Sequence, residues 1–190
     1  MDKIKLGLGI CGSYCTFDKL FGILPELCEK FDIQPIMTKT ASETDSRFGK
    51  AVEHIEKIEK LTGKRVLTTI SEVEPLGPSG VIEALLIAPC TGNTMGKLAC
   101  GITDSAVLMA AKGLLRNGKS VIIAPFTNDG LSGSIMSIGT LLNRKNIYFV
   151  PFGQDDPINK PNSVAAELTL ASDAVFAAKE GRQLQPLLMR

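Results

Sequence analysis

The architecture of this chain is indicated most clearly by the stretch VIEALLIAPCTGNTMGKLACGITDSAV (81–107). Residues 81–88 form the most continuous apolar run of the sequence, which predicts a central strand buried on both faces. The loop PCTGNT (89–94) follows, and a long helix is expected from about Met95 to Leu115. A buried strand, a polar loop and a helix in this order predict one unit of a parallel α/β sheet.

The segments on both sides continue this alternation of short apolar runs and helical patterns. Pro25 predicts a kink or a break in the first helix, because proline lacks the backbone N–H that a helix interior needs. Polar segments at 40–50 and 153–163 are expected to be loops, 65–71 is a short strand or a connector, and 74–80 is a turn-rich link. Strands are expected at 3–10, 33–38, 120–125 and 146–152, and helices at 13–31, 51–63, 135–145 and 164–179.

This order of elements predicts a single domain over residues 1–190 with a three-layer, Rossmann-like (flavodoxin-like) α/β fold, in which helices flank a parallel sheet. Such sheets bind ligands at the carboxyl ends of their strands, where the strand order reverses. The loops after the strands at 3–10, 33–38, 81–88 and 120–125 are therefore the places to expect a site.

Composition excludes several classes of function. The formal net charge of +1 provides no basic surplus for general binding to nucleic acid or acidic membranes. No apolar run approaches the roughly 20 residues of a membrane span, so a cytoplasmic protein is expected. A single histidine and the absence of a CxxC pair indicate no zinc site, and the cysteines are expected to be reduced thiols, with Cys90 and Cys100 buried and inert.

The first turn, GLGICGS (7–13), carries the glycine spacing of a phosphate-binding loop. Gly7, Gly9 and Gly12 satisfy GxGxxG, and the next helix offers free N–H groups and the hydroxyl of Ser13. A dinucleotide site would place a carboxylate at the end of the second strand, where this chain has Thr38 and its neighbours. A mononucleotide phosphate and an NADP 2′-phosphate both fit this turn, and glycines that serve only helix–strand packing are the other interpretation.

The central loop gathers small polar groups at the end of the buried strand: Thr91, Gly92, Asn93 and Thr94. They are placed to face the first turn, and the amide of Asn93 both donates and accepts hydrogen bonds. Ordinary helix caps are the alternative. His54, the only histidine, is expected to face solvent on a charged surface helix.

Residues 88–107 resemble the PASANT motif of the homo-oligomeric flavin-containing Cys decarboxylases, the family of phosphopantothenoylcysteine decarboxylase. GICGS resembles the family's GITGS, and APFTND (124–129) resembles its P-x-M-N segment, with Asn128 in the place of the family's Asn. The residues that agree with the central motif are Pro89, Asn93, Thr94, Lys97, Ala99, Gly101, Ile102 and Asp104.

The resemblance implies an FMN cofactor and a set of site residues. Asn93 and Asn128 are the expected catalytic residues, and cofactor-binding residues are expected at Gly9, Gly12, Ser13, Thr38, Thr91, Gly92, Asn93 and Thr94. The chain departs from the family pattern at Gly92, where the family has Ala, and at Thr127, where it has Met. A clear counterpart of the decarboxylase His is also absent. A stand-alone cysteine decarboxylase and a non-catalytic scaffold protein stay open as alternatives.

The tail PFGQDDPINKP (151–161) resembles one branch of this family, which acts in the mother cell of sporulating bacteria. That resemblance implies a separate dehydrogenase-like subunit that holds NAD(P), a small dicarboxylate substrate that is oxidised to pyridine-2,6-dicarboxylate, and self-assembly into trimers or dodecamers. Lys97, Lys160 and Asn128 are the candidates for clamping the substrate carboxylates.

Overall fold

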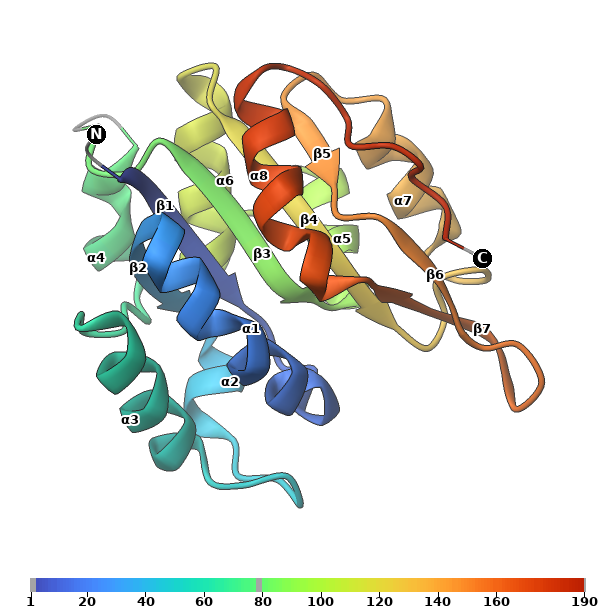
Figure 1. Cartoon of the computed structure of the whole chain (residues 1–190), viewed down its shortest axis with the longest axis horizontal. Coiled ribbons are helices and arrows are strands. Elements are labelled where there is room, and N and C mark those ends of the chain that lie inside the picture. The colour runs from blue at the N-terminus through green and yellow to red at the C-terminus, as the bar shows by residue number, and fades with distance from the viewer. Residues whose placement is uncertain (1–2, 78–79, 190) are drawn as a thin grey trace.

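A computed structural model describes residues 3–77 and 80–189 of the chain. Its centre is a parallel sheet in the order β2-β1-β3-β4-β5, in which β3 is buried at every position (Figure 1). The strands are β1 (Ile4–Ile10), β2 (Phe31–Met37), β3 (Ala84–Cys90), β4 (Ser120–Thr127) and β5 (Ile147–Phe149). The strand order reverses between β1 and β3, so the predicted α/β class and the central strand are confirmed.

Helices cover both faces of this sheet. Figure 1 shows α1 (Phe17–Lys30) and α8 (Ala171–Lys179) in front of it, and α5 (Gly92–Ala99) and α6 (Ala106–Arg116) behind it. The other helices are α2 (Lys39–Glu43), α3 (Ala51–Thr62), α4 (Ile70–Val73) and α7 (Ile135–Leu142), with short 3-10 turns at η1 (Tyr14–Thr16), η2 (Glu74–Leu76) and η3 (Leu168–Leu170). In the described part of the chain, no helix has the length and apolar character needed to cross a bilayer.

The sheet is mixed rather than wholly parallel, because an antiparallel hairpin continues it. Strands β6 (Phe152–Asp156) and β7 (Lys160–Ala166) occupy the predicted loop 153–163, and β7 pairs with the end of β4 at Phe126 and Thr127. The helix expected from 164 begins only at Ala171, because residues 164–166 belong to β7. The tip is a tight turn in which the Asp156 carboxylate accepts hydrogen bonds from the N–H groups of Ile158 and Asn159. The hairpin escaped prediction because its outer residues are polar on both faces, so they show no alternation.

The long helix expected from Met95 to Leu115 is two helices. It begins earlier, at Gly92, because the Thr91 hydroxyl caps the first turn by accepting from the N–H of Thr94. It ends at Ala99, and Gly101 then adopts a φ of +74°, a backbone conformation that favours glycine. Ser105 caps the start of α6. The carboxyl end of β3 therefore faces the beginning of an independent helix, α5.

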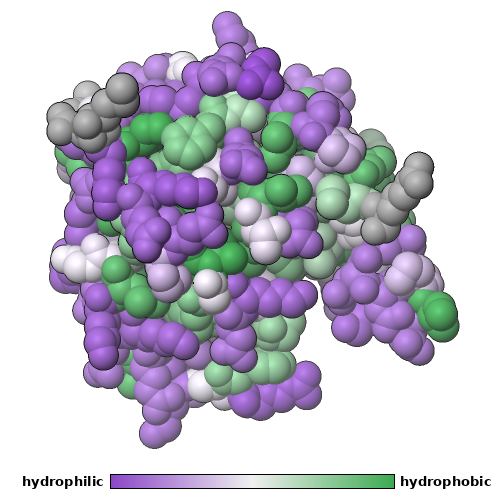
Figure 2. All heavy atoms as spheres, viewed as in Figure 1, coloured by the Kyte–Doolittle hydropathy of each residue, from purple (hydrophilic) through white to green (hydrophobic). Residues whose placement is uncertain are grey.

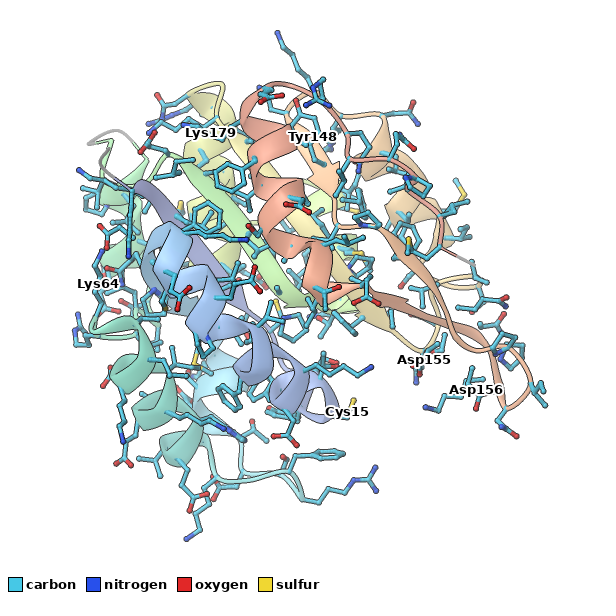
Figure 3. All side chains as sticks on the ribbon, in the orientation of Figure 1. Cys15, Lys64, Tyr148, Asp155, Asp156 and Lys179 are labelled. Carbon is cyan, nitrogen blue, oxygen red and sulfur yellow. The ribbon has the colours of Figure 1, made fainter. Side chains whose placement is uncertain are left out.

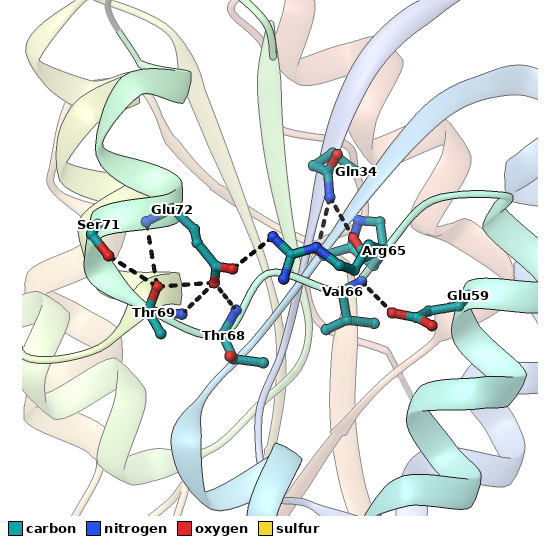
Figure 4. Close-up of polar contacts among 9 residues, drawn as sticks. Gln34, Glu59, Arg65, Val66, Thr68, Thr69, Ser71 and Glu72 are labelled. Carbon is teal, nitrogen blue, oxygen red and sulfur yellow. Dashed lines mark hydrogen bonds and ion pairs between the residues drawn. The ribbon is translucent and has the colours of Figure 1, made fainter.

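The N-terminal half also departs from expectation in two places. Pro25 lies inside α1 without breaking it, and residues 40–43 of the predicted loop belong to α2, which begins at Lys39. The connector after α3 is tied down by side chains: the Glu72 carboxylate accepts from the N–H groups of Thr68 and Thr69 and pairs with Arg65 at 2.7 Å (Figure 4). Part of the predicted 74–80 link, residues 78–79, lies outside the described residues.

His54 is buried, so the prediction that it faces solvent is wrong. Its ring is 7% exposed and packs against Phe17 at 4.9 Å and Phe21 at 5.8 Å between centroids. The buried stripe of α3 is Ala51, His54 and Ile58, whereas Val52 is 54% exposed. The aromatic rings of α1 complete a pocket that suits an imidazole, which the pattern of α3 alone does not reveal.

Candidate functional site

The first turn and the central loop meet at the carboxyl edge of the sheet. The backbone N–H of Cys11 donates to the carbonyl of Pro89 at 3.2 Å, and the Thr94 hydroxyl donates to the sulfur of Cys11 at 3.3 Å. Cys11 and Cys90 are both fully buried under this junction. Burial raises the pKa of the Cys90 thiol, whereas hydrogen bonds from Cys90 and then Thr94 hold the pKa of Cys11 below its ordinary value.

Two adjoining cavities open over this junction, with volumes of about 940 Å³ and 300 Å³. Gly12, Thr91 and Asn93 line both. The larger cavity extends from the first turn to the hairpin β6–β7, and Figure 2 shows the hairpin standing apart from the body across a hollow. Cys15 and Asp155, labelled in Figure 3, line it from these two sides. Both cavities lie at the carboxyl edge of the sheet, where the strand-order rule predicts a ligand site.

Hydroxyl groups gather around the smaller cavity. Thr38 caps α2 by accepting from the N–H of Ala41 at 3.3 Å, and Thr91 donates to the hydroxyl of Thr94 at 3.2 Å. Ser13 lines the larger cavity, where its hydroxyl lies 3.0 Å from that of Thr16 and caps no helix. The first N–H groups of α5 have no carbonyl partner within the helix. Together these groups form a donor-rich concave surface suited to an anion.

The three glycines of the first turn have different roles. Gly7 and Gly9 lie inside β1, where a Cβ on Gly9 would come within 2.9 Å of the Val107 side chain of α6. The structure therefore does not bring Gly9 to either cavity, and helix–strand packing explains it. Of these three glycines, only Gly12 lines the two cavities.

Gly92 begins α5 against a small polar cluster that no sequence pattern singles out. A Cβ there would come within 2.5 Å of Ser134 Oγ, 2.7 Å of Thr127 Oγ1 and 3.0 Å of Asp129 Oδ1. The Asp129 carboxylate accepts from Thr127 at 2.5 Å and from Ser134 at 2.9 Å, and these bonds, led by that from Thr127, hold its pKa below the ordinary value. Asp129 and Thr127 also line the larger cavity, so the two departures from the family pattern, Gly92 and Thr127, are in contact with one cluster.

The two asparagines expected to be catalytic both line the larger cavity and are exposed. Asn93 lies in the first turn of α5, and Asn128 follows the end of β4. The structure thus brings together two amides that are 35 positions apart in sequence (128 − 93) at the carboxyl edge of the sheet. Each offers a donor and an acceptor to whatever the cavity holds.

The two lysines nominated as carboxylate clamps are already paired. Lys97 lies 2.6 Å from Asp104 at the smaller cavity, and Lys160 lies 3.2 Å from Asp155 in the hairpin. Of the two cysteines expected to be buried, Cys90 is buried but Cys100 is exposed, because it follows the end of α5 at the surface. Among residues 3–77 and 80–189, no three His, Cys, Asp or Glu side chains gather as a metal site would require.

The site fits a flavin mononucleotide in size and chemistry. A volume of about 940 Å³ lies within the roughly 300–1,000 Å³ common for small-molecule and cofactor sites. The hydroxyls of Ser13 and Thr38 can donate to a phosphate, because Thr38 only accepts here and Ser13 contacts only another hydroxyl and a thiol. The hydroxyls of Thr91 and Thr94 donate to Thr94 and Cys11 in this structure, so they must rotate before they can donate to a ligand. The amides of Asn93 and Asn128 match the carbonyl and N–H edge of a flavin ring.

Comparison with known proteins agrees with this geometry. The family model described as Flavoprotein matches residues 1–154. The B subunit of dipicolinate synthase from Bacillus subtilis (strain 168) is 42% identical over 186 residues, which cover 97% of this chain and 93% of the relative.

Solved structures give the same result. The crystal structure of the dipicolinate synthase B subunit from Bacillus halodurans superposes with a TM-score of 0.90 at 39% identity, covering 100% of this chain and 99% of that one. The structure of SpaF, an FMN-dependent cysteine decarboxylase, gives a TM-score of 0.66 at 21% identity over 92% of this chain and 97% of that one, which shows a shared fold.

Proposed function

The chain belongs to the flavoprotein family, and from that premise we propose that it is the FMN-binding subunit of an enzyme that forms pyridine-2,6-dicarboxylate, or dipicolinate. The observation that best supports FMN as the cofactor is the junction of the two turns, where Gly12, Thr91 and Asn93 line both cavities. The assignment of dipicolinate as the product is supported by the names of two relatives, each described as the B subunit of dipicolinate synthase.

In this proposal, the hydroxyls of Ser13, Thr38, Thr91 and Thr94 hold the phosphate, together with the first N–H groups of α5. Asn93 and Asn128 orient the flavin and the substrate through their amides, and Gly92 lets α5 approach the Thr127–Asp129 cluster. Bound FMN supplies hydride-accepting chemistry. The chain itself positions the reactants and limits the access of water.

The reaction proposed is the oxidation of a dihydropyridine dicarboxylate. Such a ring becomes an aromatic pyridine by losing a hydride and a proton; FMN held by the residues named above would supply the hydride acceptor, and solvent would take the proton. Because aromatisation drives this step, the protein needs mainly to bind two carboxylates and a planar ring next to the hydride acceptor. This assigns the pair of subunits to the oxidoreductases.

The word subunit in the names of the relatives supports a partner. We assign that role to the A subunit of dipicolinate synthase, a dehydrogenase-like protein that holds NAD(P), in the cytoplasm of the mother cell of a sporulating bacterium. The chain is proposed to act as one domain over residues 1–190 and to assemble with copies of itself as trimers or dodecamers.

A stand-alone cysteine decarboxylase is the less favoured role. The single histidine of the sequence, His54, is buried between Phe17 and Phe21 and lines neither cavity. Neither cavity therefore contains a histidine that could assist a decarboxylation.

The test is a flavin titration followed by an activity measurement with the partner subunit. We expect the protein to quench FMN fluorescence on binding, and Asn93→Ala to abolish formation of the pyridine product, measured by its ultraviolet absorbance. The matched control is Asn117→Ala, at the end of α6 and away from both cavities. If the Asn93→Ala variant, combined with the partner subunit, retains full activity, this chain acts as a scaffold and not as a catalytic subunit.

A further inference from the structure

The larger cavity carries two cations that the proposed function has not used, Lys19 and Arg47. The other charged groups of that cavity are engaged: Lys160 pairs with Asp155 at 3.2 Å, and Asp129 accepts from Thr127 and Ser134. Within the described residues, neither Lys19 nor Arg47 has an ion-pair or hydrogen-bond partner, and both are exposed. One wall of the cavity therefore offers uncompensated positive charge.

Arg47 is presented by a rigid turn. The backbone groups of Ser46 and Gly49 exchange hydrogen bonds of 3.0 and 3.1 Å, and the Ser46 hydroxyl accepts from the N–H of Phe48 at 3.1 Å. Gly49 has a φ of +131° and lies directly on the buried ring of His54, where a Cβ would come within 2.8 Å of it. The turn is thus fixed on the packed interface of α1 and α3, so the backbone that carries Arg47 is already ordered before binding and only the side chain loses freedom.

An exposed aromatic ring accompanies this cation. Phe48 is 43% exposed, lines the same cavity, and lies 4.8 Å from the Arg47 guanidinium carbon, measured to the ring centroid. A guanidinium binds a carboxylate through two parallel hydrogen bonds, and an aromatic ring stacks on a planar ligand. The two side chains together match an aromatic carboxylate better than an aliphatic one.

We infer that Arg47, with Lys19 in the same cavity and Phe48 stacked on the ligand ring, binds one carboxylate of a planar aromatic dicarboxylate. The ligand class rests on the proposed function, which the inference deepens. The rival anion is the flavin phosphate. Thr38 and Thr94 line only the smaller cavity, whereas Arg47 lines only the larger one, which Ser13 and Thr91 also line. The exposed ring of Phe48 next to Arg47 therefore favours the carboxylate of a planar ligand, and titrations with both anions separate the two.

The experiment uses calorimetry to measure how the full chain binds pyridine-2,6-dicarboxylate. Each titration is run with and without FMN, and with and without the partner subunit. Losing a charged, bidentate contact corresponds to a roughly 10- to 100-fold weaker Kd, so we expect that loss for Arg47→Gln and a smaller one for Arg47→Lys. Phe48→Ala should weaken pyridine-2,6-dicarboxylate more than the non-aromatic glutarate. The control is Arg116→Gln, which removes an exposed cation at the end of α6.

Parallel titrations with FMN and riboflavin distinguish the two anions. Unchanged flavin binding in Arg47→Gln, with weakened dicarboxylate binding, supports the inference. An Arg47→Gln protein that loses affinity for FMN but not for riboflavin or dicarboxylate overturns it, as does a wild type that binds no dicarboxylate under any condition. A protein that takes up no flavin but binds dicarboxylate through Arg47 removes the proposed cofactor and leaves the inference standing.

Discussion

The hydroxyl of Thr94 donates a hydrogen bond to the sulfur of Cys11 over 3.3 Å, and this contact joins residues 83 positions apart. Thr94 is 4% exposed, and its oxygen also accepts from Thr91 at 3.2 Å. The beginning of α5 is therefore bound to the end of β1 through side chains beneath both cavities. Because Thr91 lines these cavities, a ligand that hydrogen-bonds to Thr91 affects the linked hydrogen bonds from Thr91 to Thr94 and from Thr94 to Cys11.

Replacing Thr94 by Val should weaken FMN binding. Valine keeps the shape of the side chain but leaves Thr91 without its acceptor and Cys11 without its donor. Since one such bond contributes about 1 kcal/mol, we expect a Kd for FMN about fivefold to tenfold higher, measured by flavin fluorescence. The control is Thr68→Val, whose hydroxyl makes no hydrogen bond to described residues. Equal affinities in the two variants would contradict a cofactor role for Thr94.

Replacing Gly92 by Ala should destabilise the protein. The new Cβ would overlap Ser134 Oγ and Thr127 Oγ1, so α5 or the cluster must shift, at a cost of about 1–3 kcal/mol. Gly96→Ala is the matched control on the same helix: its Cβ would meet only Ser137 Oγ at 3.7 Å, and removing a helical glycine stabilises by about 0.5–1 kcal/mol. Urea unfolding of the two variants should therefore give shifts of opposite sign, and shifts of the same sign would argue against the clash.

The sequence predicted the parallel core and the edge of the sheet where the two cavities open, because both depend on local patterns. Buried strands appear as continuous apolar runs, and the strand ends place Thr38, Thr91 and Asn128 at one edge without knowledge of side-chain contacts. The engaged state of Lys97 and Lys160 was not predictable, because their partners are set by a helix break at Gly101 and by the hairpin. The burial of His54 depends on α1, which lies far from it in sequence.

Arg47 and Phe48 illustrate the same limit. In the sequence they belong to a polar segment that resembles an ordinary loop. In the structure, Gly49 packs on the ring of His54, a tertiary contact that no local sequence pattern reveals, and Arg47 and Phe48 line the larger cavity. A positively charged residue beside an exposed aromatic one was the available signal, and it is too common at surfaces to be specific.

The Glu72 carboxylate should contribute to stability in a pH-dependent way. Hydrogen bonds, first from the N–H of Thr68 and then from Arg65, lower its pKa to about 2. A carboxylate with a depressed pKa in the folded state stabilises above its ordinary pKa, and this contribution is lost as the pH falls from about 4.5 toward 2. Glu72→Gln should therefore lower the free energy of unfolding by about 1 kcal/mol at pH 7 and by less at pH 3.

Urea unfolding at pH 7, 5 and 3 measures this difference, with Glu56→Gln as the control. Glu56 is exposed on α3 and has no ion-pair or hydrogen-bond partner in the described part of the chain. A constant difference between wild type and Glu72→Gln over this range would be inconsistent with the lowered pKa.

Replacing His54 by Leu should make the protein more resistant to mild acid. Burial lowers the pKa of His54, against the opposing charges of Glu53 on α3 and Asp18 on α1, while the neighbouring charge of Lys57 also lowers it. The ring nitrogen Nε2 is buried without a hydrogen-bond partner. As the pH falls below about 6.5, the unfolded chain gains a proton at this residue before the folded chain does, so the wild type loses stability. A leucine binds no proton and leaves no polar atom unpaired.

We therefore expect His54→Leu to equal or exceed the wild type in stability at pH 7.5 and to gain on it as the pH falls to 5.5, measured by urea unfolding. Because Gly49 rests on this ring, a second readout follows the turn itself. Trypsin cleaves after Arg47 only when the turn opens, so the ratio of wild-type to His54→Leu cleavage at that bond should rise as the pH falls from 7.5 to 6. Comparison at each pH cancels the pH dependence of the protease. A ratio independent of pH would show that His54 does not hold the turn through its neutral form.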